Sequence, residues 1–428
     1  MTDERIAALG PAFAAELRRY RDCFGQDRTA RHVDTYCRGL LSDAPRKSVE
    51  PIALASGTAV RTLQEFLVTS AWDHVDARDR FRRRMADALA ERPPDPLGTV
   101  GVIDETSAAK KGDRTPGVQR QYLGCVGKID NGIVTVHVGV TKGRFQALLD
   151  AELDLPQSRA MDRTRCREAG IPDDVRYRAK WRIALDQLIR LRANGVTFDG
   201  LTFDEGYGSK GPFLWVLGLA NQKFVAEVPT NFGVRNAPDG PSRRADAHQP
   251  GKRTGRWRRY RIGRKTLADR VWRARRSRVW AARRWHTLVT AVNEATGEVK
   301  FFVTNAVGES PGRVLAVAFR RATVEHAFRV AKSEAGLTHV EGRQYVGLER
   351  HLILTPIVLG FVAVHTERLR GEKCGGDAGA GVPGVERGVP GAVPEAARDG
   401  RPAARRRGHP VPPAAERAGD PIPQETAA

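Results

Sequence analysis

The sequence predicts an α/β protein in which helices flank a mixed sheet, and three observations carry this prediction. Apolar side chains recur at helical spacing through residues 1–95. From residue 96 they form short runs typical of buried strands, separated by helical stretches. From residue 371 the composition changes to Gly, Pro and Ala. The length of 428 residues leaves room for two or three domains.

The N-terminal region, residues 1–95, is predicted to be a helical domain. Apolar residues recur every three or four positions in residues 6–20 and again in 61–67. Residues 91–96 contain three prolines, which end a helix and mark a domain boundary.

The middle of the chain alternates strands with helices. Strands are expected at 99–104, 120–127 and 133–140, the last two separated by a turn at 130–132, followed by a helix at 176–194, a strand at 200–204, a helix at 210–219 and a strand at 223–228. An antiparallel start followed by a helical crossover predicts a mixed sheet.

The remaining chain resumes this pattern and then loses it. Two strands are expected at 287–292 and 299–304, a long helix over 311–335 and an apolar closing helix at 352–364. The last 58 residues contain 11 Gly, 9 Pro and 12 Ala and no aromatic residue, so we expect a disordered tail at 371–428.

The net charge of +21 is concentrated in one segment. Residues 241–286 hold seventeen Lys or Arg and two acids, a net charge of +15, together with four of the seven tryptophans. Arginine neutralises phosphates, and aromatic rings stack on unpaired bases. We therefore expect contact with DNA through residues that include Arg256, Trp257, Arg258 and Arg259. The alternative is a solvated basic loop whose tryptophans pack locally.

Two aspartates, Asp104 and Asp204, follow apolar strand runs. Two carboxylates on neighbouring strands repel each other unless a cation bridges them, and Mg²⁺ prefers oxygen ligands. Glu325, on the helix that also carries Arg321 and Lys332, is the candidate for a third acid. Each acid alone is more simply read as a turn former or a surface ion pair. Their joint order favours a two-metal site for phosphoryl displacement.

Three motifs carry a resemblance to a known family. They are Val102-Ile103-Asp104-Glu105-Thr106-Ser107 with Lys110-Lys111-Gly112, then Phe203-Asp204-Glu205-Gly206-Tyr207-Gly208, and finally Arg321, Glu325 and Lys332 in their spacing. With them, residues 30–368 resemble bacterial insertion-sequence transposases of the DDE class, which have an RNase H-like catalytic domain interrupted by a large insertion.

The resemblance implies a catalytic and metal-binding triad of Asp104, Asp204 and Glu325. It implies two Mg²⁺ ions per site, with Mn²⁺ as a substitute, and contact of Arg321 and Lys332 with the DNA end. Lys110 and Lys111 are further DNA-binding candidates. The implied partners are double-stranded DNA, comprising the terminal inverted repeats and the target, and a second copy of the chain in a synaptic homodimer.

The implied domains are 1–95, a helical domain that binds the DNA end, 96–228, the first part of the catalytic domain, 229–305, the basic insertion, 306–370, the second part with the Glu helix, and 371–428, the tail. The sequence departs from the family at Ala318, where an aromatic residue is usual, and at Glu205, where Ala is usual. Glu105 and Glu205 therefore compete as metal ligands.

The expected activity is metal-dependent cleavage and strand transfer in cut-and-paste transposition. The alternatives are a DNA endonuclease without strand transfer and a decayed, non-catalytic DNA-binding remnant.

No run of eighteen apolar residues and no signal-peptide pattern are found, so no membrane partner is expected. Five scattered cysteines fit neither a disulfide framework nor a cysteine zinc site. A bacterial cytoplasmic, nucleoid-associated location is therefore expected.

Overall fold

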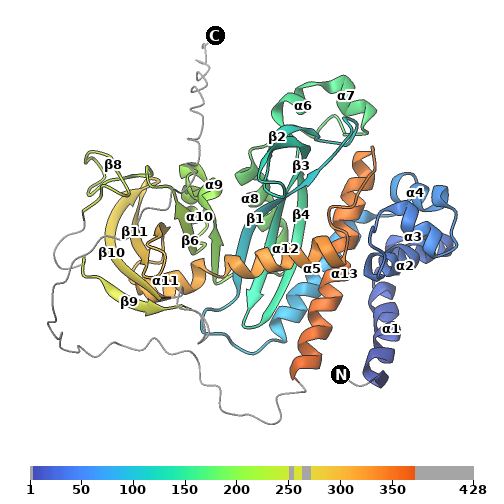
Figure 1. Cartoon of the computed structure of the whole chain (residues 1–428), viewed down its shortest axis with the longest axis horizontal. Coiled ribbons are helices and arrows are strands. Elements are labelled where there is room, and N and C mark those ends of the chain that lie inside the picture. The colour runs from blue at the N-terminus through green and yellow to red at the C-terminus, as the bar shows by residue number, and fades with distance from the viewer. Residues whose placement is uncertain (1–2, 250–254, 263–270, 372–428) are drawn as a thin grey trace, which may run out of the picture. The chain divides into compact units, whose positions relative to one another are not determined.

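The fold centres on one large sheet, shown in Figure 1. The computed structural model describes residues 3–249, 255–262 and 271–371. Among these residues, nine strands pair in the order β2-β3-β1-β5-β6-β12-β11-β10-β9. A tenth strand, β4, also pairs with β3, over a different part of β3 from β2. The strands are β1 (Val100–Ala109), β2 (Gln119–Leu123), β3 (Lys128–Lys142), β4 (Phe145–Asp154), β5 (Gly200–Phe203), β6 (Phe224–Val228), β9 (Arg258–Arg261), β10 (Val271–Ala281), β11 (Arg284–Asn293) and β12 (Val299–Thr304).

The sheet is mixed, as the sequence predicts. β1, β5 and β6 run parallel to one another, whereas β3 is antiparallel to β1 and β4 is antiparallel to β3. Parallel neighbours need a crossover, and α8 (Lys180–Ala193) supplies the helix between β4 and β5. This arrangement confirms the predicted class, a mixed α/β sheet flanked by helices.

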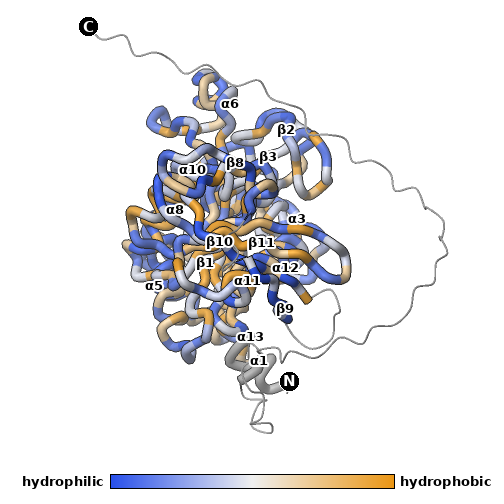
Figure 2. The backbone as a smooth tube through the Cα atoms, turned by 90° about the vertical axis from the view of Figure 1, so that its left-hand side faces the viewer, coloured by the Kyte–Doolittle hydropathy of each residue, from blue (hydrophilic) through white to orange (hydrophobic). Residues whose placement is uncertain are grey.

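Helices cover both faces of the sheet. α8 and α10 (Gly211–Leu219) bury Ile183, Leu191 and Phe213 in the cluster that contains Ile103 and Phe203. On the opposite face, α11 (Pro311–Ala318) packs with Val100, and α12 (Arg321–Glu334) packs with Val102. Figure 2 shows hydrophobic residues, in orange, in the region of β1, β10 and β11.

The N-terminal region is helical, as predicted. Its helices are α1 (Asp3–Arg18), α2 (Asp27–Leu41), α3 (Val49–Ala55), α4 (Val60–Val68) and α5 (His74–Ala90). They pack around α13 (Tyr345–Gly371), and the residues Phe66, Phe81 and Ile357 belong to one core cluster. The segment Tyr345–Thr366 of α13 is long and apolar enough to cross a membrane, but 72% of its window is buried, as in a core helix.

The predicted turn at 130–132 is wrong. These residues lie inside β3, where Gly132 pairs with Gln119 and Ala109, and the hairpin turns instead between Leu123 and Lys128. A Cβ at Gly132 would lie 2.4 Å from the carbonyl oxygen of Ala108. The glycine therefore permits close approach of β3 to β1 rather than a turn.

The long helix expected over 311–335 is two helices, α11 and α12. Phe319, between them, packs its ring 5.0 Å from that of Trp272 and 6.1 Å from that of Phe302. Arg320 donates to the carbonyl oxygen of Gly143 at 2.9 Å. These tertiary contacts hold the break in place, and they set the direction of α12 over the strands.

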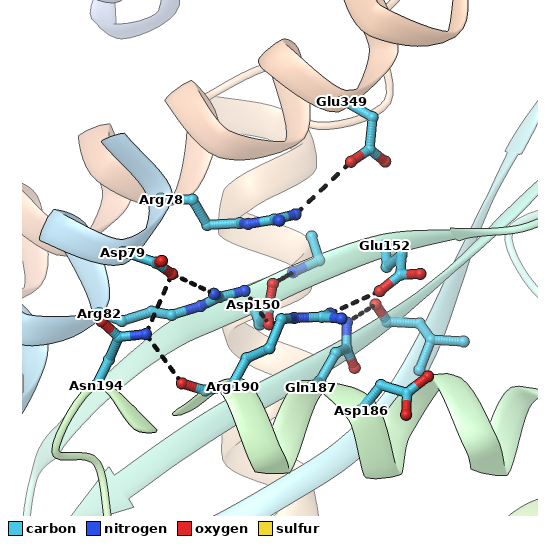
Figure 3. Close-up of polar contacts among 12 residues, drawn as sticks. Arg78, Asp79, Arg82, Asp150, Glu152, Asp186, Gln187, Arg190, Asn194 and Glu349 are labelled. Carbon is cyan, nitrogen blue, oxygen red and sulfur yellow. Dashed lines mark hydrogen bonds and ion pairs between the residues drawn. The ribbon is translucent and has the colours of Figure 1, made fainter. Parts of the chain in front are cut away.

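β4 is a strand that the sequence analysis does not assign. Its acids Asp150 and Glu152 are buried, and Figure 3 shows the arginines around them. Arg82 of α5 lies 2.5 Å from the Asp150 carboxylate, and Arg190 of α8 lies 2.6 Å from that of Glu152. An unpaired buried charge is costly, so these ion pairs allow an acidic strand inside the fold. They also connect the N-terminal helices to the sheet.

Within residues 229–305, β7 (Gly233–Val234) and β8 (Arg243–Arg244) form a separate two-stranded sheet, and the other described strands continue the large sheet. β12 pairs antiparallel with β6, and β11, β10 and β9 follow outward. The domain boundaries stay a prediction. The described residues belong to one compact unit, Met1–Glu386, and a second unit, Arg387–Ala428, lies wholly outside them, as does the predicted disordered tail beyond residue 371.

Candidate active site

Asp104 and Asp204 lie side by side because of the register of β1 and β5. The two strands are parallel, and Ile103 pairs with Phe203. The next residues, Asp104 and Asp204, therefore lie at the same level of the sheet. Ile103 and Phe203 pack into the cluster on the α8 and α10 side. Successive side chains point to opposite faces, so the carboxylate of Asp104 within β1 faces α12, and Asp204 directly follows β5 as the N-cap residue of α9.

Asp104 lies in a position that disfavours its charge. The side chain is half-buried, and burial raises the pKa of its carboxyl to about 6. The guanidinium of Arg321 lowers that pKa, whereas the charge of Asp204 raises it further. Asp204 caps α9 (Glu205–Gly208), where its Oδ1 accepts a hydrogen bond of 3.3 Å from the amide of Tyr207.

Glu325 lies on α12, which packs tightly on β3. A Cβ at Gly139 would come within 2.9 Å of Val324, so the glycine allows this approach. Val324 is buried and Glu325 is exposed. Glu325 lines a cavity of about 790 Å³ together with Asp104, whereas Asp204 is not among the lining residues.

Glu227 of β6 is a third acid in the row of aspartates, and the sequence analysis does not identify it. Ala226 pairs with Phe203, so Glu227 follows at the level of Asp204. Its carboxylate lies 2.8 Å from Arg321 and 2.6 Å from Lys300. No local signal marks Glu227, because it lies within an apolar run and only the register places it beside the aspartates.

Arg321 therefore pairs with one acid of the row and lies near two others. Its guanidinium donates to Glu227, and its charge acts on Asp104 and on Glu205. In this structure it supplies positive charge to the row of acids, and its predicted contact with DNA stays a prediction.

The two competing ligands, Glu105 and Glu205, differ in their surroundings. Glu105 Oε2 lies 2.6 Å from Lys180 Nζ on α8, so this carboxylate already has a cationic partner. Glu205 is exposed at the start of α9. Burial is the main cause that raises the pKa of Glu205, and the charge of Glu227 raises it further. The charge of Glu205 therefore interacts with the row of acids.

The predicted lysines have different roles in the structure. Lys332 lines the acid cavity, where burial lowers its pKa and the charge of Asp104 opposes that shift. Lys110 is half-buried, and its Nζ donates to the carbonyl oxygens of Thr338 and Val340. Burial lowers the pKa of Lys110 to about 8. Lys111 beside it is exposed.

The described part of the basic segment contributes β9 and β10 at the far end of the sheet. Arg256, Trp257, Arg258 and Arg259 are exposed on and beside β9, its edge strand. Arg275 lies 4.8 Å from the ring centroid of Trp257. Arg259 is paired with Glu294 at 2.6 Å.

The other tryptophans of the segment pack inside the protein or on each other. Trp272 is 5% exposed. The rings of Trp280 and Trp285 meet edge to face at 5.6 Å, and Arg278 lies 4.1 Å from the centroid of Trp285. Of the four, Trp257 is the one with an exposed side chain.

Part of the acidic site fits a hard divalent cation. Asp104 and Asp204 offer adjacent carboxylates, and a cation would stabilise the charged form of Asp104, whose pKa is raised mainly by burial and further by the charge of Asp204. Within the described ranges, however, no three His, Cys, Asp or Glu side chains are grouped closely enough to hold a metal ion. Glu325 shares the cavity with Asp104 without completing such a group.

Comparisons with known proteins identify the family of the chain. A family model described as DDE superfamily endonuclease matches residues 19–291, which include Asp104 and Asp204 and end before Glu325. The chain is 32% identical over 233 residues to a probable transposase for insertion sequence element IS701 from Microchaete diplosiphon. That match covers 49% of this chain and 57% of the relative's length. On the strength of the family match, the chain belongs to the DDE superfamily endonucleases.

Proposed function

We propose that the protein is an insertion-sequence transposase that cleaves the ends of its element and joins them to target DNA. The observation that carries this proposal is the register of β1 and β5, which sets Asp104 beside Asp204, close to Glu325 and Lys332 around the cavity that Asp104 borders. The relative that is a probable transposase supports the same assignment.

The acids of the chain would hold the catalytic ions. Family membership implies divalent metal ions, and Asp104, Asp204 and Glu325 are the proposed ligands for two Mg²⁺ or Mn²⁺ ions. When bound, such ions stabilise charge on the attacking and leaving oxygens of an in-line displacement at phosphorus. Glu325 would join the aspartates in the loaded site, since it already borders their cavity.

The cationic side chains would position the DNA. Lys332 borders the cavity and would contact a phosphate beside the scissile bond. Arg321, held by Glu227, would balance the charge of the aspartates until metal and DNA bind. The exposed arginines around Trp257 would bind the flanking duplex.

The proposed partners are the terminal inverted repeats, target DNA and a second copy of the chain. Joining two ends in one complex needs two active sites, so we propose a homodimer during synapsis. The helical N-terminal domain is proposed to recognise the repeats, in the bacterial cytoplasm at the nucleoid.

A cleavage assay tests this function. The substrate is a plasmid carrying the DNA that flanks the gene, incubated with the full chain in Mg²⁺. We expect nicks at the element ends and joined products, neither of which should appear in EDTA. Cleavage without joined products would instead favour an endonuclease that lacks strand transfer. DNA binding without any cleavage in Mg²⁺ or Mn²⁺ would favour the non-catalytic remnant.

A further inference from the structure

Four arginine side chains border a second cavity, of about 220 Å³. They are Arg114 in the β1–β2 loop, Arg159 of α6 (Gln157–Met161), Arg165 of α7 (Arg163–Glu168) and Arg343 just before α13. In Figure 1, α6 and α7 lie at the end of the sheet beyond β2 and β3.

The cavity has a folded support. Arg159 Nε donates to the carbonyl oxygen of Val118 at 2.6 Å, and Gln344 Nε2 donates to that of Glu168 at 3.1 Å. The amide of Tyr345 donates to the carbonyl oxygen of Ala169 at 2.8 Å. A small buried apolar cluster that includes Cys166 and Ile171 lies within the same helical segment. Arg159 and the chain segments that border the cavity therefore belong to a packed structure.

The positive charge of the cavity is only partly neutralised. Glu168 lies 2.9 Å from Arg114, and Asp113 lies 3.7 Å from Arg165. Arg343 has no ion pair or hydrogen bond to any other residue that the structure describes. The charges of Asp113 and Asp162 also act on Arg159, so three acids face four arginines and leave an excess of one positive charge. Like charges held together in this way are stabilised by a bound anion.

The cavity adjoins the acidic site through one stretch of chain. Thr338 and His339 border the acid cavity, and Arg343 and Gln344 border the arginine cavity. A DNA strand carries a phosphate at every nucleotide, so a duplex seated on the acid cavity continues past this stretch. We propose that the arginine cavity is a second phosphate site that binds the backbone of the same DNA. The inference rests on the proposed function for its ligand.

The test compares two double variants of the full chain. Arg114→Gln/Arg343→Gln removes cavity charges, and Arg167→Gln/Arg176→Gln removes two exposed charges from the same region outside the cavity. The affinity for a duplex of the flanking DNA is measured by fluorescence anisotropy in EDTA over a range of salt concentrations. The cavity variant should lower the salt slope by about two, roughly 0.9 for each lost phosphate contact. The control variant should leave the slope close to that of the parent.

A second arm separates DNA from free polyphosphate, which has the same chemistry. Thermal unfolding is followed with inorganic tripolyphosphate for the parent and the cavity variant. Equal salt slopes for the cavity and control variants overturn the proposal. A tripolyphosphate effect that the cavity variant abolishes, with an unchanged DNA slope, also overturns it and assigns the site to a free anion. Failure of the proposed function shows separately, as cleavage that survives Asp104→Asn.

Discussion

The two ends of the sheet place charge in opposite ways. Around β4, β1, β5 and β6 the charges are buried or half-buried and lie within reach of specific partners, such as Arg82 on Asp150 and Arg321 on Glu227. On β9 and β10 the arginines are more numerous and largely exposed. Removing a charge in the first region breaks a buried ion pair and should lower the free energy of unfolding strongly. Removing one exposed charge in the second region should change it little.

The largest expected effect is on cleavage. Asp104→Asn or Asp204→Asn keeps the acceptors for the Glu105 and Tyr207 amides, so the fold should survive. The loss of several kcal/mol of transition-state stabilisation predicts a fall in nicking of about a thousandfold. A nicking assay in Mg²⁺ measures the fall, and anisotropy should show DNA binding retained. Full nicking by either variant would refute the assignment.

The comparison between the two ends can be made directly in stability. Arg82→Met leaves Asp150 buried without its closest partner and should lower the free energy of unfolding by about 3–5 kcal/mol. Arg278→Met on β10 removes an exposed arginine stacked on Trp285 and should cost about 1 kcal/mol or less. Urea unfolding of both variants measures the difference. Equal losses would show that burial does not distinguish the two regions.

Glu227 tests how the row of acids is balanced. In Glu227→Gln, Arg321 loses its carboxylate partner and should compete more strongly with metal for Asp104. The Mg²⁺ concentration for half-maximal nicking should rise on the order of tenfold, equivalent to about 1.4 kcal/mol of charge interaction.

Glu298→Gln is the matched control for Glu227→Gln. Glu298 lies 3.4 Å from Lys300, the other partner of Glu227, whereas Arg321 pairs with Glu227. An identical rise in both variants would remove Arg321 from the explanation.

The smallest effects are expected at the basic edge. Arg256→Gln or Arg258→Gln should each reduce the salt slope of DNA binding by about 0.9. Arg259→Gln should change it less, because Glu294 already neutralises that side chain. Anisotropy titrations measure all three. No change for Arg256 and Arg258 would support the alternative of a solvated basic loop.

The sequence predicts the regular parts of the fold well. The helices α8 and α10 and the strands β5 and β6 lie close to the expected ranges, because their periodicity is uninterrupted, whereas β1 begins as expected but continues past Asp104 to Ala109. β4 escapes prediction since its acids are neutralised by residues far away in the chain, which no local pattern reports. β9 and β10 are not predicted either, because their many arginines hide the alternation of apolar residues.

The sequence alone determined the family, the class of fold and the two aspartates at the ends of apolar runs, because these depend on local patterns of residues. The tertiary structure decided which acids meet. Strand register sets Asp104 beside Asp204 and adds Glu227, whereas the packing of α12 on Gly139 brings Glu325 to the cavity of Asp104. Register and packing depend on contacts between segments that are distant in the sequence. Those contacts set the burial and the charged neighbours of each site residue.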